Sequence, residues 1–198
     1  MSRAASKRSG RRSENGQALL EFALFLTLIL IMIAGVVDVG GLLNDHVSVE
    51  YATRQAARTG AVLGNQPTAD CAIISAVNAS LSSVANVTVT QIMIYNAGAD
   101  GLPQGTTSET VYAGDPICTI VGNTPTLSEA PAPNNYPPSS RDDNPYTEDS
   151  LGVQVSYSYA FQFPLLGSGV FQTNDYTVMP INPVVLPTPI LAPTPTAG

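Results

Sequence analysis

Residues 18–37 read ALLEFALFLTLILIMIAGVV, twenty residues with a single charged side chain, Glu21. A helix rises 1.5 Å per residue, so this run spans about 30 Å, the thickness of the hydrocarbon layer of a bilayer. The sequence therefore predicts a transmembrane helix, which we place at residues 17–38. Only 12% of the 198 residues are charged, about half of what a soluble domain carries, and this low share agrees with a membrane anchor.

The basic residues gather on the N-terminal side of this run. Five of the eight lie in the first twelve positions, which hold no acid: Arg3, Lys7, Arg8, Arg11 and Arg12. Beyond Gly60 only Arg141 is basic, whereas ten acids follow. Because basic segments stay on the cytoplasmic side, we expect a single pass through the cytoplasmic (inner) membrane, with the N-terminus inside and the C-terminal part extracytoplasmic. The net charge of −7 argues against a nucleic-acid partner.

Glu21 is an acid inside the apolar run. A carboxylate costs roughly 2.5–3.5 kcal/mol at the centre of a bilayer and less near its surface, so such acids mark functional positions. A side chain this close to the helix end can also reach the headgroups, and that is the alternative explanation. Gly16 lies between the basic stub and the run. A cut after Gly16 would make Gln17 the new N-terminus and Glu21 the fifth residue.

The segment Gly16–Phe22, GQALLEF, resembles the cleavage motif of type IV prepilins, in the form found in tight-adherence (Tad/Flp) pseudopilins. Farther on, Asp38-Val39-Gly40 and residues 52–61, ATRQAARTGA, resemble the second half of the TadE-like family. In that family a helix leaves the membrane at an Asp-x-Gly step and continues to an Ala-Ala-Arg-x-Gly-Ala stretch. The motif positions in this chain are Asp38, Gly40, Arg54, Ala56, Ala57, Arg58 and Gly60. Many relatives carry Arg directly after Asp-x-Gly, where this chain has Gly41, so an ion pair at that place is not carried over.

The resemblance implies a structural protein, a pseudopilin or minor pilin of a Flp-type type IV pilus. It implies that a prepilin peptidase cuts between Gly16 and Gln17. Glycine suits this position because it has no side chain that would hinder the close approach of the peptidase. The leader would be residues 1–16. Glu21, followed by Phe22, would then pair with the freed amine of Gln17 on a neighbouring subunit, which offsets the desolvation of both charges. The implied partners are the peptidase, the major Flp-type pilin, a sister pseudopilin and the inner-membrane assembly platform.

Outside the membrane we expect an α+β, pilin-like fold, in which the long N-terminal helix packs on a small, mainly antiparallel sheet. The helix should continue through residues 39–64, because no proline interrupts it and small residues recur near helical spacing. These small residues either let another element pack closely or reflect the helix propensity of alanine. A bend is expected at Gly35 or at Gly40–Gly41. The sequence Gly64-Asn65-Gln66-Pro67 should end the helix.

Residues 65–180 are expected to form the α+β ectodomain. Apolar spacing predicts a short helix at residues 69–83. Runs rich in β-branched residues, or alternating in polarity, predict strands at 87–95, 110–113, 117–121, 151–161 and 171–179. Prolines and an acidic cluster indicate an exposed loop at residues 122–150, where a solvated run of charges fits the pattern better than a calcium site. Residues 181–198 are predicted to be a proline-rich tail.

Cys71 and Cys118 both fall in the extracytoplasmic part, where oxidation is allowed, and two is the number that one bridge needs. We expect a disulfide, worth about 4 kcal/mol in the chain-entropy description, with two thiols as the alternative. His46 has no neighbouring base in the sequence and is expected to be a plain exposed residue.

The sequence has no GxSxG and no HExxH motif. We therefore expect no enzyme, no catalytic residue, no metal site and no cofactor. The remaining alternative function is an uncleaved, signal-anchored extracytoplasmic protein whose acidic loop and tyrosine-bearing sheet bind an external ligand. Such a protein needs no cut at Gly16 and should tolerate Glu21→Leu.

Overall fold

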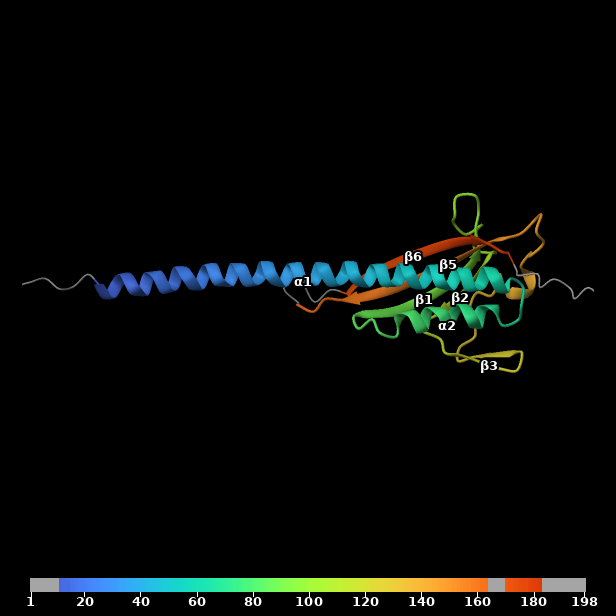
Figure 1. The fold of residues 1–198 in the computed structure, drawn as a ribbon, viewed down its shortest axis with the longest axis horizontal. Coiled ribbons are helices and arrows are strands. Elements are labelled where there is room, and N and C mark those ends of the chain that lie inside the picture. The colour runs from blue at the N-terminus through green and yellow to red at the C-terminus, as the bar shows by residue number, and fades with distance from the viewer. Residues whose placement is uncertain (1–10, 164–169, 183–198) are drawn as a thin grey trace, which may run out of the picture.

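The computed structural model describes residues 11–163 and 170–182, and Figure 1 shows their arrangement. Residues 1–10 of the predicted leader and 183–198 of the predicted tail lie outside the described residues. A single helix, α1 (Arg11–Leu63), holds 53 residues. Its N-terminal half extends away from the rest of the molecule, and its C-terminal half lies along a sheet (Figure 1).

The helix α1 is unbroken across the glycines where we expected a bend. It stays helical through Gly35, Gly40 and Gly41, and Figure 1 shows no change of direction there. The glycines lie within continuous helical turns, whose backbone hydrogen bonds do not depend on a side chain. The predicted end of the helix is confirmed: Gly64 has a φ of +53°, and its N–H donates to the carbonyl of Gly60 at 2.8 Å.

The sheet has four strands in the order β2-β1-β5-β6, and every neighbouring pair is antiparallel. The strands are β1 (Val87–Asn96), β2 (Glu109–Ala113), β5 (Ser150–Ala160) and β6 (Val170–Pro180). The second helix, α2 (Ala69–Leu81), lies beside α1 and follows it in the chain (Figure 1). The predicted fold class is confirmed: a long N-terminal helix packs on a small antiparallel sheet.

The core lies between the two helices and one face of the sheet. The predicted alternation along β5 is confirmed, since its inward-facing side chains are buried: Leu151, Val153, Val155, Tyr157 and Tyr159. All of these except Tyr159 belong to one hydrophobic cluster with Val49, Ala56 and Ala57 of α1 and with Ile73, Ile74 and Val77 of α2. Such a face stabilises the fold by about 25 cal/mol for each Å² of apolar surface removed from water.

The opposite face of the sheet has one buried tyrosine. The ring of Tyr95 lies where a side chain at Gly152 would be, because a Cβ built there would come within 2.3 Å of the ring. The hydroxyl of Tyr95 donates to the carbonyl of Gly101 at 3.0 Å. Burial, with smaller contributions from Tyr176 and Asp100, raises the pKa of Tyr95 to about 12.

Two expectations about the ectodomain need correction. The predicted strand at 117–121 is β3 (Cys118–Val121), and it does not join the main sheet but pairs with β4 (Thr124–Leu127) in a separate hairpin. Residues 122–150 are not simply an exposed loop. They contain β4, a 3-10 helix η1 (Pro138–Ser140), and the buried side chains of Tyr136 and Arg141. This segment is held in place by partners that lie far away in the sequence.

Candidate functional site

The protruding half of α1 is the most apolar surface of the described residues. Every side chain from residue 16 to residue 33 is exposed, including Phe22 at 64% and Met32 at 64%. Among the described residues, one helix is long and apolar enough to cross a membrane, namely α1 from Gly16 onward. Water does not accommodate an apolar surface of this length, so this half of α1 fits a single-pass membrane anchor.

The predicted cleavage and assembly residues all lie on this protruding half. A Cβ at Gly16 would meet nothing within 4 Å, and Gln17 is exposed beside it. Glu21 is exposed too, and no ion pair among the described residues involves it. Among the described residues, Gly16, Gln17 and Glu21 are therefore exposed to contact with other molecules.

Asp38 is the first charged residue after the apolar run, and it is 1% exposed. Its carboxylate accepts hydrogen bonds from the backbone N–H of Gln162, at 3.0 Å, and of Phe163, at 3.2 Å. These two N–H groups follow β5 beyond its last pair with β6, Ala160 with Val170, so the sheet leaves them without a partner. Asp38 thus closes the end of the sheet onto α1, a role that the sequence motif did not reveal.

The glycines near Asp38 differ in what surrounds them. A Cβ at Gly40 would meet nothing within 4 Å, whereas a Cβ at Gly41 would come within 2.8 Å of the hydroxyl oxygen of Tyr159. That hydroxyl lies 3.5 Å from the carbonyl oxygen of Asp38, to which it donates. Gly41 therefore makes room for a tyrosine that contacts the helix backbone.

The small residues of the Ala-Ala-Arg-x-Gly-Ala stretch lie on the packed face of α1. Ala56 and Ala57 are fully buried. A Cβ at Gly60 would come within 2.4 Å of the Leu151 side chain and 2.7 Å of the Ile73 side chain. Close packing is therefore the role of these residues, and the helix propensity of alanine alone does not explain them.

The opposite face of the same helix is exposed and carries both charge and apolar surface. Arg54 pairs with Glu50 one turn earlier, and Arg58 is exposed. Along the same stretch Leu43, Val47 and Tyr51 are exposed by 60%, 61% and 64%. These three residues are spaced by four, so they form one stripe. The stripe continues the apolar surface of the protruding half into the part of α1 that carries the ectodomain.

A buried polar network ties α2 to the segment 122–150. Arg141, 4% exposed, forms an ion pair with Asp70 at the start of α2, and Tyr112 donates to the other oxygen of that carboxylate at 2.8 Å. The guanidinium also lies over the ring of Tyr136, 5.2 Å from its centre. Burial, reinforced by Asp70, raises the pKa of Tyr112 above its usual range. The network is structural, since its groups are turned inward.

The acidic cluster of residues 142–149 organises its own loop. Asp149 accepts hydrogen bonds from Asn96 at 2.8 Å and from the hydroxyl of Tyr136 at 3.0 Å. Asp142 accepts from the hydroxyl of Thr147 and from the N–H of Asn144, and these two bonds lower the pKa of its carboxyl. Within residues 11–163 and 170–182, no three His, Cys, Asp or Glu side chains come together as metal ligands would.

Cys71 and Cys118 form a disulfide that joins α2 to the β3–β4 hairpin, with their Cα atoms 5.4 Å apart. His46 is exposed, as expected, but its Nδ1 lies 2.9 Å from the hydroxyl oxygen of Tyr157. Burial is the main cause that raises the pKa of Tyr157, with Asp175 and Asp45 adding to it.

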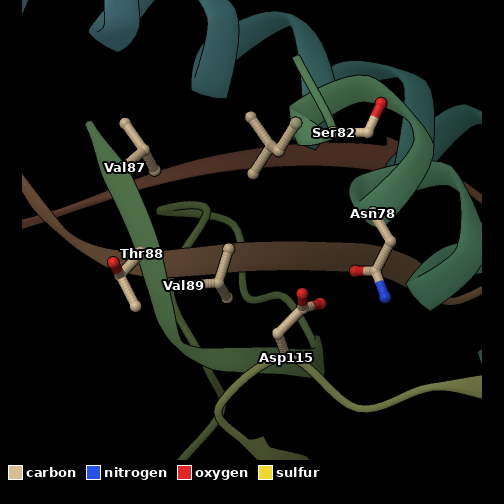
Figure 2. A pocket seen from close by; sticks show the side chains of 7 residues that line it. Asn78, Ser82, Val87, Thr88, Val89 and Asp115 are labelled. Carbon is tan, nitrogen blue, oxygen red and sulfur yellow. The ribbon is translucent and has the colours of Figure 1, made fainter. Parts of the chain in front are cut away.

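A shallow pocket of about 180 Å³ lies between the end of α2 and the start of β1 (Figure 2). Its lining combines Val87 and Val89 with the polar Asn78, Ser82 and Asp115 (Figure 2). The volume falls below the roughly 300–1,000 Å³ of typical small-molecule sites. This pocket therefore gives no support to a ligand-binding role.

Sequence reasoning missed two features of the site region, the Asp38 contact and the Arg141 network. One signal for the second was present: Arg141 is the only basic residue among ten acids beyond Gly60. A lone cation in an acidic region is a candidate for a buried ion pair, because it has many potential partners and charge burial requires one.

Residues 16–58 match the model of the TadE-like protein family. The match begins at Gly16, includes Glu21 and Asp38, and ends at Arg58, two residues before Gly60. It covers about a fifth of the chain, and the sheet lies outside it. A search of curated proteins and a search of solved structures each found no match. The resemblance to the TadE-like family is confirmed for this segment.

Proposed function

We propose that this chain, TadE-like over residues 16–58, is a minor pilin or pseudopilin of a tight-adherence type IV pilus. It is a structural subunit with no catalytic role of its own, needed for the assembly or the initiation of the fibre. A prepilin peptidase removes residues 1–16, and the mature chain begins at Gln17. The subunit lies in the cytoplasmic membrane with its N-terminus inside and its ectodomain outside, and it can enter the pilus.

The observation that carries the proposal is the exposed apolar stripe of Leu43, Val47 and Tyr51. It lies beyond residues 17–38, so lipid tails do not cover it, and it faces away from the sheet that α1 packs on. One apolar face of α1 packs on its own domain, and a second apolar face is exposed. Such a helix is suited to packing against a helix of another subunit. The major pilin and a sister pseudopilin are the helices that we expect there.

The surroundings of Gly16 and Glu21 support the two roles that the family resemblance gives them. Gly16 and Gln17 are exposed, and they lie at the border of the basic stub and the apolar run. Glu21 has no ion-pair partner among the described residues, and its partner would come from another subunit. The freed amine of Gln17 on a neighbouring subunit would supply it, and the pair would offset the desolvation of both groups.

The test is the intact mass of the chain in membranes of strains with and without a prepilin peptidase. The expected mature chain begins at Gln17, depends on the peptidase and is blocked by Gly16→Leu. Gly35→Leu, at a glycine that also has open space around it, is the matched control and should still be cut. A chain that keeps residues 1–16 beside an active peptidase would contradict the proposal.

A second test concerns Glu21. In the pilus-forming host, Glu21→Leu should leave the chain cut and inserted but should abolish surface pili, whereas Thr27→Leu in the same apolar run should leave piliation unchanged. The alternative, an uncleaved anchored binding protein, predicts that Glu21→Leu has no effect. The exposed stripe on α1 favours the pilin.

A further inference from the structure

The end of the β5–β6 hairpin carries exposed apolar side chains. Phe163 follows β5, and Val170 and Phe171 begin β6. They are exposed by 41%, 59% and 47%. We call Phe163, Val170 and Phe171 the hairpin end. Exposed apolar side chains that occur together at one end of a sheet are candidates for a contact with something apolar.

The position of the hairpin end along α1 is fixed by hydrogen bonds. The N–H of Phe163 donates to the carboxylate of Asp38 at 3.2 Å. On β5, Tyr159 contacts the carbonyl of Asp38, and Tyr159 is the register partner of Phe171. The hairpin end therefore lies beside Asp38.

Asp38 directly follows the twenty-residue apolar run, so it marks the level at which α1 leaves the hydrocarbon layer. At this level, the boundary of the headgroups and the acyl chains, apolar side chains such as Phe are buried favourably in proteins that lie on membranes. The sequence has no Lys or Arg between residues 13 and 53 or between 142 and 182. Attraction to anionic lipids is therefore not available here, and any affinity for the membrane must come from apolar contact.

We propose that the hairpin end inserts into the outer headgroup region of the membrane and holds the ectodomain against it. The bilayer interface covers these side chains, and the Asp38 hydrogen bonds transmit the attachment to α1. This inference rests on the membrane span of the proposed function but needs neither cleavage at Gly16 nor a pilus. It gives the ectodomain two attachments to the membrane, one covalent through α1 and one through the hairpin end.

The chain has no Trp, so a single introduced Trp reports on its own surroundings. The experiment uses the full chain in phosphatidylcholine nanodiscs, with lipids brominated either near the headgroups or near the chain ends. Phe163→Trp and Phe171→Trp are expected to emit at shorter wavelength and to be quenched most strongly by the bromines near the headgroups. Exchange of a third of the lipid for phosphatidylglycerol should leave this quenching unchanged.

The matched control is Tyr176→Trp. Tyr176 lies on β6 and is 47% exposed, as Phe171 is, but it is five residues farther from the hairpin end, or about 17 Å along a strand. It should emit at the wavelength of a hydrated Trp and escape quenching. Quenching of Phe163→Trp and Phe171→Trp no stronger than that of Tyr176→Trp would overturn the inference. A blue shift without quenching would also overturn it, because protein and not lipid would then cover the site.

Leu30→Trp separates this inference from the membrane span on which it rests. Its emission should be quenched most by the bromines near the chain ends. If it is, a negative result at Phe163 and Phe171 concerns the hairpin end alone. If Leu30→Trp escapes both kinds of bromine, the membrane span and the proposed function fail together with the inference.

Discussion

The carboxylate of Asp38 accepts a hydrogen bond from the backbone N–H of Phe163, although the two residues are 125 positions apart in the chain. The N–H of Gln162 binds the same carboxylate. A strand that runs beyond its last ladder pair leaves backbone donors that need an acceptor, and a carboxylate is a strong one. The Asp38 side chain of α1 therefore binds the backbone donors just beyond β5, at the end of the sheet that lies nearest the membrane anchor.

Asp38→Ala should lower the free energy of unfolding of the full chain in detergent micelles by about 1–3 kcal/mol, because two backbone N–H groups lose the charged acceptor to which they donate. Asp38→Asn keeps one acceptor oxygen and should cost less. The measurement is the midpoint of urea unfolding, followed by near-ultraviolet circular dichroism. Glu129→Ala, at an exposed acid, is the control and should leave the midpoint in place. An unchanged midpoint in Asp38→Ala would show that water replaces the carboxylate at no cost.

Gly60→Ala and Gly40→Ala form a matched pair within one helix. A methyl group at Gly60 would overlap Leu151 and Ile73, so we expect a loss of about 1–3 kcal/mol from overpacking. At Gly40 the methyl group meets nothing within 4 Å, and the better helix propensity of alanine should add about 0.5–1 kcal/mol. Urea unfolding should move in opposite directions for the two variants. A shift of the same sign in both would contradict the close contact at Gly60.

The ion pair of Arg141 with Asp70 is buried, whereas that of Arg54 with Glu50 is exposed. Arg141→Leu leaves the Asp70 carboxylate buried without its cation, and we expect a loss of about 3–5 kcal/mol. Arg54→Leu should change the free energy of unfolding by less than about 1 kcal/mol, since water screens that pair. Thermal unfolding of both variants measures the difference. Equal effects would mean that Asp70 finds another partner.

Tyr95 should make the fold sensitive to alkaline pH. Its pKa is raised to about 12 in the folded chain, and it is about 10 when the chain is unfolded. The folded state therefore holds this proton more tightly, so the stabilisation is complete below pH 10 and is lost as pH rises toward 12. Burial also raises the pKa values of Tyr112 and Tyr136, so their contribution to the stability of the fold also decreases above pH 10.

Tyr95→Phe is the variant that checks the sensitivity to alkaline pH. The slope of unfolding free energy against pH between 10 and 12 should become shallower in this variant, because the proton that differs between the two states is gone. Tyr146→Phe, at a residue 92% exposed, should keep the slope of the unmodified chain. The measurement is a series of urea unfolding curves across that pH range. Identical slopes in both variants would show that Tyr95 ionises without opening the fold.

The parts of the fold that repeat a local pattern were predictable from the sequence. The apolar run and the alanine spacing give α1, and the alternation of Leu151, Val153 and Val155 gives β5, because each pattern is contained in consecutive residues. The relative placement of the family motif was predictable too, since Gly16, Glu21 and Asp38 lie on one helix. The positions of these residues follow from 3.6 residues per turn and need no tertiary contact.

Features that depend on distant partners were not predictable in this way. Arg141 is buried because Asp70, 71 positions earlier, provides its counter-charge. Strand β4 contains Pro125, which argues against a strand in a sequence pattern, and it forms only because β3 lies beside it. The expected bend in α1 was wrong for a related reason: glycine permits a bend, but no contact among the residues that the structure describes requires one.

The last described residue, Asn182, donates its backbone N–H to the carbonyl of Ala61, near the C-terminal end of α1. That end of the helix is the one opposite the membrane anchor (Figure 1). A fluorescent or affinity label joined directly after Asn182 would therefore start on the outermost part of the domain. Immunogold staining against such a label would report whether subunits are sheared off with the fibres or remain with the cell envelope, without altering either the anchor or the packed face of the helix.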